Sequence, residues 1–188
     1  LWHGTGVARE VERGQDLLRR AAVEGDAHAI NTLAVICDQE AGSAAHAKTF
    51  EMYRAAVRLS HINENPLPAC NLATCYLEGK GVSKNLRMAR RLFQRAAQAG
   101  DADAQFSLGR MAFCEPNGPN YAQTLNWLER AAEQMHADAM FLLGRLLMSG
   151  QAGVLERTRG ARLLASAARH GHADARALIA NLSLEETV

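Results

Sequence analysis

Aromatic residues, long apolar runs and an excess of charge of either sign are all scarce in this chain. Phe, Trp and Tyr make up 5% of its 188 residues, which disfavours a sheet core built on aromatic and β-branched side chains. The 21 basic residues are balanced by 20 acidic ones, so no overall field recruits nucleic acid or an anionic membrane. No apolar run approaches the ~20 residues that span a bilayer.

Motifs for catalysis and metal binding are also missing. The sequence contains no HExxH, GxSxG or P-loop pattern, and no Ser or Cys has a nearby His placed as a dyad partner. The cysteines show no paired CxxC spacing, which disfavours zinc. We interpret them as free and mostly buried thiols, which favour the cytoplasm over the periplasm: Cys37, Cys70, Cys75 and Cys114. We therefore expect no catalytic residue, no metal and no cofactor.

The ends of the chain suggest a piece of a longer protein. It starts on Leu rather than Met, and its first residues do not form a signal peptide. We expect a fragment whose compartment is not set by its own sequence. Residues 1–7 resemble a glycine turn that follows a helix, and 184–188 are expected to form a C-terminal tail.

An Ala-Ala pair recurs along the chain at a nearly constant period. The first Ala of each pair is residue 21, 55, 96, 131 and 167, which gives steps of 34, 41, 35 and 36 residues. Such self-similarity is typical of a helical solenoid, in which each repeat packs only against its neighbours. The longer step coincides with the connection 59–68.

One repeat shows the pattern most clearly between residues 68 and 101. A first helix is predicted from Pro68 to Glu78, because Pro is tolerated in an opening turn, and a glycine turn at 79–82 ends it. A second helix is predicted from Ser83 or Asn85, both good N-caps, and Gly100 ends it. Asp101 then caps the next first helix; Asp26, His136 and His172 hold this capping position elsewhere.

Each first helix also carries a Leu or Ile followed by a small residue. A mid-helix Gly costs about 1 kcal/mol relative to Ala, yet this position holds only Gly or Ala. Close approach of two helices explains the restriction. The pairs are Leu33-Ala34, Leu72-Ala73, Leu108-Gly109, Leu143-Gly144 and Ile179-Ala180.

These motifs together resemble the Sel1-like repeat, a relative of the tetratricopeptide repeat with the pattern Leu-Gly-x-x-Tyr-x-x-Gly-x-Gly-Val followed by a helix with Ala-Ala. Residues 72–81 match it with Ala73 for Gly, and Trp127 matches the aromatic before Ala-Ala. The resemblance implies an all-α, right-handed α/α superhelical solenoid of about five repeats, forming a single domain over residues 1–183. Some secreted relatives carry a Cys in the Ala-Ala position, where this chain has Ala56, Ala97, Ala132 and Ala168, so that subclass is disfavoured.

The resemblance also implies a function. Sel1-like proteins assemble protein complexes, in bacteria for signalling, envelope polysaccharide or secretion, and have no catalytic activity of their own. We therefore expect a non-catalytic scaffold or adaptor that binds a partner protein or peptide, without nucleic acid or membrane insertion. The alternative is a structural module that associates with itself through its end repeats. A hydrolase is a third class, for which no residue can be nominated.

A partner would lie along the concave face, which first helices line in such solenoids. Positions two before and two after the repeated Leu are four residues apart, share one side of the helix and vary between repeats. Two of the pairs are Phe with Arg, residue types common at binding hot spots; the alternative is that these Phe residues are ordinary core and the arginines merely solvated. The predicted contact residues are Asn31, Thr74, Phe106, Arg110, Phe141, Arg145 and Asn181.

Two further clusters have simpler explanations. Arg87, Arg91 and Arg95 form a basic line along one second helix, which is explained by a solvated outer face, with an acidic partner as the alternative. His170, His172 and Asp174 could suggest a metal, but the capping register already accounts for His172.

Overall fold

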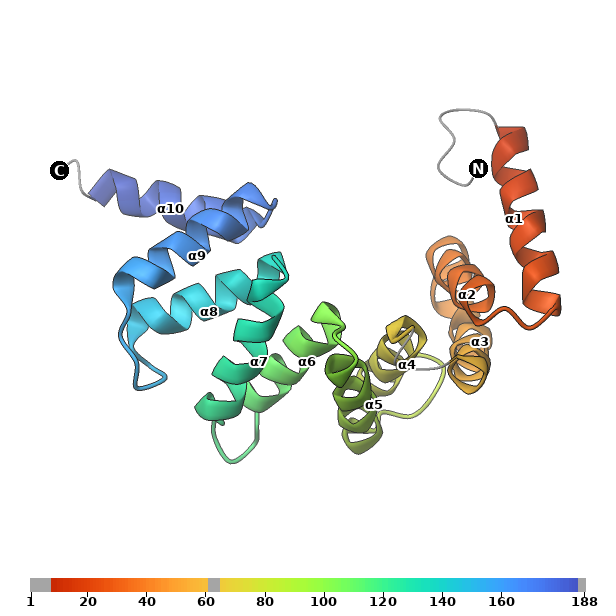
Figure 1. The fold of residues 1–188 in the computed structure, drawn as a ribbon, viewed down its shortest axis with the longest axis horizontal. Helices are drawn as coiled ribbons and strands as arrows, with labels where there is room; N and C mark the ends of the chain where they lie inside the picture. The colour runs from red at the N-terminus through yellow and green to blue at the C-terminus, as the bar shows by residue number, and fades with distance from the viewer. Residues whose placement is uncertain (1–7, 61–64, 186–188) are drawn as a thin grey trace. The chain divides into compact units, whose positions relative to one another are not determined.

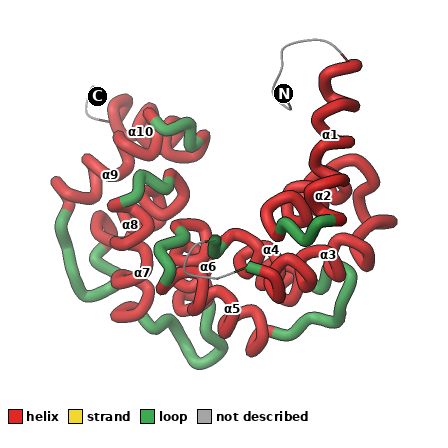
Figure 2. Tube along the Cα trace, turned by 45° about the vertical axis from the view of Figure 1, so that its right-hand side comes forward, coloured by secondary structure: helices red, strands yellow, loops and turns green. Residues whose placement is uncertain are grey.

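The computed structural model describes residues 8–60 and 65–185, with side chains for residues 11–40, 43–60 and 65–180. Within these ranges the chain forms helices and connecting turns and no strand (Figure 1; Figure 2), so the prediction of an all-α fold is confirmed. The expected glycine turn at 1–7 lies outside the described residues.

The chain divides into two compact units, residues 1–100 and 101–188. The first contains α1 (Ala8–Val23), α2 (Ala27–Ala41), a 3-10 turn (Gly42–Ala45), α3 (His46–Leu59), α4 (Leu67–Glu78) and α5 (Leu86–Gln98). The second contains α6 (Ala102–Phe113), α7 (Tyr121–Glu133), α8 (Ala137–Ser149), α9 (Arg157–Arg169) and α10 (Ala173–Glu185). The first helices of the repeats are α2, α4, α6, α8 and α10, and the second helices are α1, α3, α5, α7 and α9.

This division bears on the predicted boundaries. In a solenoid each repeat packs on its neighbours rather than around one central core. A chain predicted to be a single domain over residues 1–183 can therefore contain two compact units, each made of whole repeats. The helix α10 continues to Glu185, two residues into the segment expected to be a tail.

The pair α4 and α5 forms where the sequence predicts it. Gly79 ends α4 with a φ of 80°, and Asn85 rather than Ser83 caps α5, its side-chain oxygen accepting a hydrogen bond from the Met88 amide at 3.0 Å. The inward face of α5 is buried: Ala89, Leu92, Phe93, Ala96 and Ala97. Sequence rules thus give both the start of this helix and its buried side.

The pair α2 and α3 departs from the glycine-turn pattern. The 3-10 turn Gly42–Ala45 joins these two helices in its place. The turn of the next repeat lies against the start of α3, since a Cβ on Gly81 would be 2.0 Å from the carbonyl oxygen of His46. Only glycine fits there, because any side chain would overlap the backbone of α3.

Small residues bring the helices of the second unit into close contact, as the Leu-Gly register predicts. A Cβ on Gly144 of α8 would lie 3.0 Å from the carbonyl oxygen of Gly160 in α9, and a Cβ on Gly160 would lie 2.8 Å from that of Gly144. The backbones of α8 and α9 therefore touch at this crossing. The core beside it is formed mainly by Leu128, Met140, Leu143, Leu147 and the Ala-Ala residues Ala131 and Ala167.

Candidate functional site

On α6, the two predicted contact residues Phe106 and Arg110 touch each other at the protein surface. The Phe106 ring is half-buried and packs against the core of the second unit, whereas Arg110 is exposed. The guanidinium carbon of Arg110 lies 5.6 Å from the centre of the Phe106 ring. This is a cation–π distance, and such a contact stabilises an exposed Arg by about 0.5–1 kcal/mol.

The next first helix repeats the arrangement. Phe141 of α8 is half-buried on the same core, Arg145 is exposed, and its guanidinium carbon lies 5.6 Å from the ring centre. Each Phe ring thus packs on the core with one side and contacts an Arg with the other, and partner binding by these residues stays a prediction.

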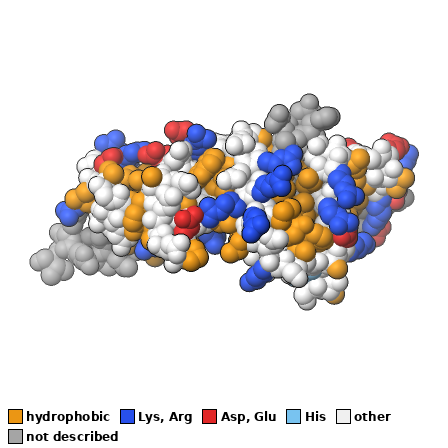
Figure 3. Space-filling model, turned by 90° about the horizontal axis from the view of Figure 1, so that it is seen from below, with side chains coloured by type: hydrophobic (Ala, Val, Ile, Leu, Met, Phe, Trp, Pro, Cys, Tyr) orange, Lys and Arg blue, Asp and Glu red, His pale blue; other side chains and the backbone are white. Residues whose placement is uncertain are grey.

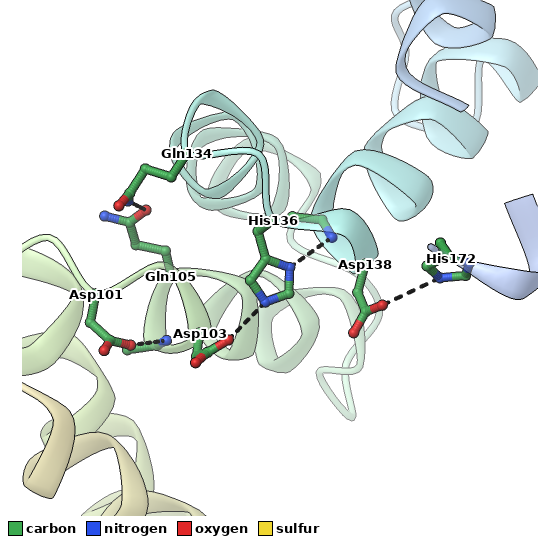
Figure 4. Close-up of polar contacts among 9 residues, drawn as sticks. Asp101, Asp103, Gln105, Gln134, His136, Asp138 and His172 are labelled. Atoms are coloured by element: carbon green, nitrogen blue, oxygen red, sulfur yellow. Dashed lines mark hydrogen bonds and ion pairs between the residues drawn. The ribbon is translucent and has the colours of Figure 1, made fainter. Parts of the chain in front are cut away.

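A histidine cap lies against each Phe ring. Nδ1 of His136 accepts a hydrogen bond from the Ala139 amide at 3.2 Å and so begins α8. The proton is therefore on Nε2, which donates to the Asp103 carboxylate at 3.0 Å (Figure 4). The His136 ring lies 4.7 Å from the Phe106 ring, at an angle of 31°. This hydrogen bond lowers the pKa of Asp103.

His172 repeats this geometry one repeat later. Its Nε2 lies 3.4 Å from Asp138 (Figure 4). Its Nδ1 accepts a hydrogen bond from the Ala175 amide at 3.2 Å, and its ring stacks on Phe141 at 4.1 Å and 28°. The capping role predicted for His136 and His172 is confirmed. We refer to Arg110–Phe106–His136 and Arg145–Phe141–His172 as the two stacks.

The arginines of the two stacks have no acidic partner in the part of the chain that the structure describes. Asp103 and Asp138, each seven residues before one of these arginines, contact the cap histidines instead. The cap histidines hold the rings, and the rings hold the guanidinium groups at the surface. Each stack therefore presents a positioned charge that nothing within the described residues neutralises.

The other predicted contact residues differ from this pattern. Asn31 is 1% exposed, and its side-chain oxygen accepts a hydrogen bond from the Asn71 amide at 2.9 Å, so its prediction as a contact residue is wrong. The hydrogen bond satisfies the Asn31 oxygen and allows its burial. Thr74 is half-buried, and its hydroxyl donates to the Cys70 carbonyl oxygen at 3.1 Å. The side chain of Asn181 lies outside the described residues.

The basic line on α5 is exposed. Arg87, Arg91 and Arg95 all face solvent, and none pairs with a carboxylate among the described residues. In Figure 3 the part of the face occupied by α5 shows Lys and Arg side chains with hydrophobic ones between them. Among the described residues no aromatic ring contacts these three guanidinium groups, unlike those of the two stacks.

A recess beside Arg145 was not predicted from the sequence. It measures about 120 Å³ and is lined by Phe113 from the end of α6, by Leu142, Arg145, Leu146 and Ser149 from α8, and by Gln151. The contact residues predicted from the sequence are only those two positions before and two positions after the repeated Leu, and Phe113 and Leu142 occupy neither position. The half-buried apolar positions Phe113 and Leu142 were the available signal, since such residues near an exposed Arg can line a pocket.

The histidine and cysteine side chains outside the stacks do not form a metal site among the described residues. Nδ1 of His170 lies 2.8 Å from the Ser166 carbonyl oxygen, and no group of three potential metal ligands comes together within the described ranges.

Cys70 and Cys75 are buried as expected, whereas Cys37 is half-buried and Cys114 exposed. Burial raises the pKa of Cys75 to about 11, so this thiol stays protonated at neutral pH. No helix in the described part is long and apolar enough to cross a membrane.

Comparison with known families identifies these repeats. The model of the Sel1 repeat matches four segments that together cover more than half of the chain: residues 1–26, 69–101, 102–136 and 137–172. The chain belongs to the Sel1 repeat family. Two segments have no match, 27–68 and 173–188, and the first of them is the one in which α2 and α3 depart from the glycine-turn pattern.

Solved structures share the fold. A protective antigen of uropathogenic Escherichia coli with an SLR fold matches at a TM-score of 0.74 and 24% identity over 91% of this chain and 36% of its own. A Sel1 repeat protein from Oxalobacter formigenes matches at 0.70 and 24% identity, over 82% of this chain and 62% of its own. A protein of Klebsiella pneumoniae described as a sel1 repeat protein matches at 0.62 and 18% identity, over 97% and 88%. The chain thus spans about a third and three fifths of the first two.

These matches confirm the predicted Sel1-like solenoid fold class. No curated protein matches the chain. Sel1 repeat proteins are generally protein-interaction scaffolds and are typically non-catalytic.

Proposed function

We propose that this Sel1 repeat chain is a non-catalytic adaptor, which binds a partner protein or peptide along the face of its first helices. The binding residues are those of the two stacks, with Arg110 and Arg145 as the charged contacts. The resemblance to the family implies a bacterial multiprotein complex as the setting.

One observation carries the proposal: two successive first helices present the same positioned and unneutralised Arg. An Arg held against an aromatic ring loses little side-chain entropy when it binds, so more of the interaction energy appears as affinity. Arg and aromatic residues are also the types most common at binding hot spots. A merely solvated Arg would not need a supporting Phe and a stacked cap in two consecutive repeats.

The test is capture of partners from cells that naturally produce the protein, with three baits compared by quantitative mass spectrometry. The first bait is the wild-type chain, and the second carries Arg110→Glu and Arg145→Glu. The third carries Arg87→Glu and Arg91→Glu, which make the same change in net charge on α5.

We expect a set of proteins that binds the wild type and the α5 variant and is lost from the stack variant. Circular dichroism should show equal helicity in all three. If all three baits capture the same proteins equally, the partners bind outside the two stacks. If both variants lose the same proteins equally, the loss is a general effect of the change in net charge. Sedimentation at several concentrations tests the alternative, in which the chain associates with itself.

A further inference from the structure

The recess between α6 and α8 has the dimensions and chemistry to bind one amino-acid side chain. Its volume of about 120 Å³ is well below the ~300–1,000 Å³ of pockets that hold whole small molecules. Phe113, Leu142 and Leu146 form an apolar side of the recess, and Arg145, Ser149 and Gln151 form a polar side; an aliphatic side chain can pack against the apolar side. A recess of this kind fits a single anchor residue of a longer ligand.

The positive charge of Arg145 at the rim of the recess determines which type of ligand residue should lie next to the anchor side chain. Arg145 lines the recess and has no carboxylate partner within the described ranges. The Phe141 ring holds the guanidinium in place, so its position does not depend on the ligand. Gln151 adds a polar side chain at the same rim, where a peptide backbone can form hydrogen bonds, whereas the Ser149 hydroxyl already donates to the Leu146 carbonyl oxygen at 3.2 Å.

From these observations we infer that the recess binds an acidic segment of a partner protein, with an aliphatic side chain inside and an adjacent Asp or Glu carboxylate on Arg145. This inference rests on the proposed adaptor function and specifies its ligand. Arg110 occupies the equivalent position one repeat earlier and takes a second carboxylate of the same segment. A basic segment does not fit, because it would face two unneutralised arginines, and like charges across an interface oppose binding.

Peptide titrations followed by NMR chemical shifts test the ligand class on the whole chain. The probes are peptides with blocked ends, made of three tandem Glu-Leu-Glu-Gly units, three Lys-Leu-Lys-Gly units or three Glu-Gly-Glu-Gly units. The first should shift the amides of residues 142–149 and bind at least about tenfold more tightly than either of the others, because a charge-assisted hydrogen bond and a buried aliphatic group each contribute at least the ~1.4 kcal/mol that corresponds to a tenfold change. The inference is overturned if the basic or the Leu-free peptide, or a short single-stranded oligonucleotide, binds equally well, or if no probe shifts these amides.

Two variants of one exposed residue test the role of Arg145 without removing it. Ser149→Glu places a carboxylate one helical turn from Arg145, where it competes with the ligand, whereas Ser149→Gln adds similar bulk without charge. Both substitutions remove the Ser149 hydroxyl and add similar bulk to the rim, so only their difference reports the charge; we expect the affinity for the acidic peptide to be about tenfold lower in Ser149→Glu than in Ser149→Gln. Equal affinities in the two variants would contradict the contact with Arg145.

The same variants separate a failure of this inference from a failure of the adaptor function. If Ser149→Glu keeps the natural partners that the double variant of Arg110 and Arg145 loses, the first-helix face binds them but the recess does not. If neither variant loses partners, the adaptor function itself is wrong for this face.

Discussion

The close crossing of α8 and α9 gives a quantitative test of the packing. The variant is Gly160→Ala, which adds one methyl group at a buried position in α9. On helix propensity alone, Ala in place of Gly stabilises a helix by about 1 kcal/mol. The structure predicts the opposite sign.

The added Cβ would lie 2.8 Å from the Gly144 carbonyl oxygen and 2.6 Å from Cγ of Met148. The Met148 side chain can rotate away, but the carbonyl belongs to the backbone of α8 and cannot. The helices must therefore separate by several tenths of an ångström, beside the buried side chain of Leu164. Overpacking of this kind costs about 1–3 kcal/mol. We take the upper end because backbone is involved, and after the gain in propensity a net loss of about 2 kcal/mol remains.

The neighbouring residue provides a matched control. Ala161 is exposed in the same helix turn, so Ala161→Gly should cost only the propensity difference of about 1 kcal/mol. Guanidinium unfolding followed by circular dichroism measures both variants. Solenoids can unfold in parts, so hydrogen exchange of the α8 and α9 amides should localise the loss. If Gly160→Ala stabilises the protein by as much as Ala161→Gly destabilises it, the argument from close contact is refuted.

Three further predictions concern the caps and turns. His136→Ala should lower stability by about 1 kcal/mol through loss of the cap, and His136→Asn should recover most of it, as measured by chemical unfolding. Asp103 has a lowered pKa, so its contribution is present at neutral pH and lost as the pH falls through its folded value. Asp103→Asn should cost less than about 1 kcal/mol at pH 7, and its difference from wild type should begin to shrink near the ordinary carboxyl pKa of about 4 and vanish only below the lowered folded pKa. A persistent difference at pH 2 would show another cause. Met135 has a φ of 61°, and the equivalent turns elsewhere have glycine, Gly25 and Gly171, at this position. Met135→Gly should therefore raise the unfolding free energy by about 1 kcal/mol. An unfolding free energy below that of the wild type would mean that the half-exposed Met side chain stabilises the turn.

The helices and their caps were predictable because their causes are local. Asn85 begins α5 through a hydrogen bond to a backbone amide three residues away, and Gly79 ends α4 through its own backbone angle. The Leu-Gly register was predictable for a related reason. Each repeat meets the same neighbour in the same way, so a restriction repeated in the sequence indicates a contact repeated in space.

The proposed binding surface was predictable only in part, because it depends on how successive repeats pack. Asn31 occupies the same register as Phe106 and Phe141 but is buried by a contact with Asn71, forty residues later. The recess beside Arg145 likewise needs Phe113 from one repeat and Leu142 from the next. Helical periodicity gives the side of a helix on which a residue lies, but not the distance to the next first helix, and that distance decides both cases.

The cap histidines take part both in a local feature, the start of a helix, and in the packing of one repeat on the next. Phe106 is followed thirty residues later by His136, and Phe141 by His172 after thirty-one, whereas Cys70 holds the Phe position in the repeat whose next cap is Asp101. An Asp caps a helix as well as a His does, so capping alone does not explain the choice. Only the imidazole offers a ring to stack on Phe while its second nitrogen contacts an Asp. We therefore interpret His at the cap as part of the binding surface, since it fixes the Phe ring that positions each Arg.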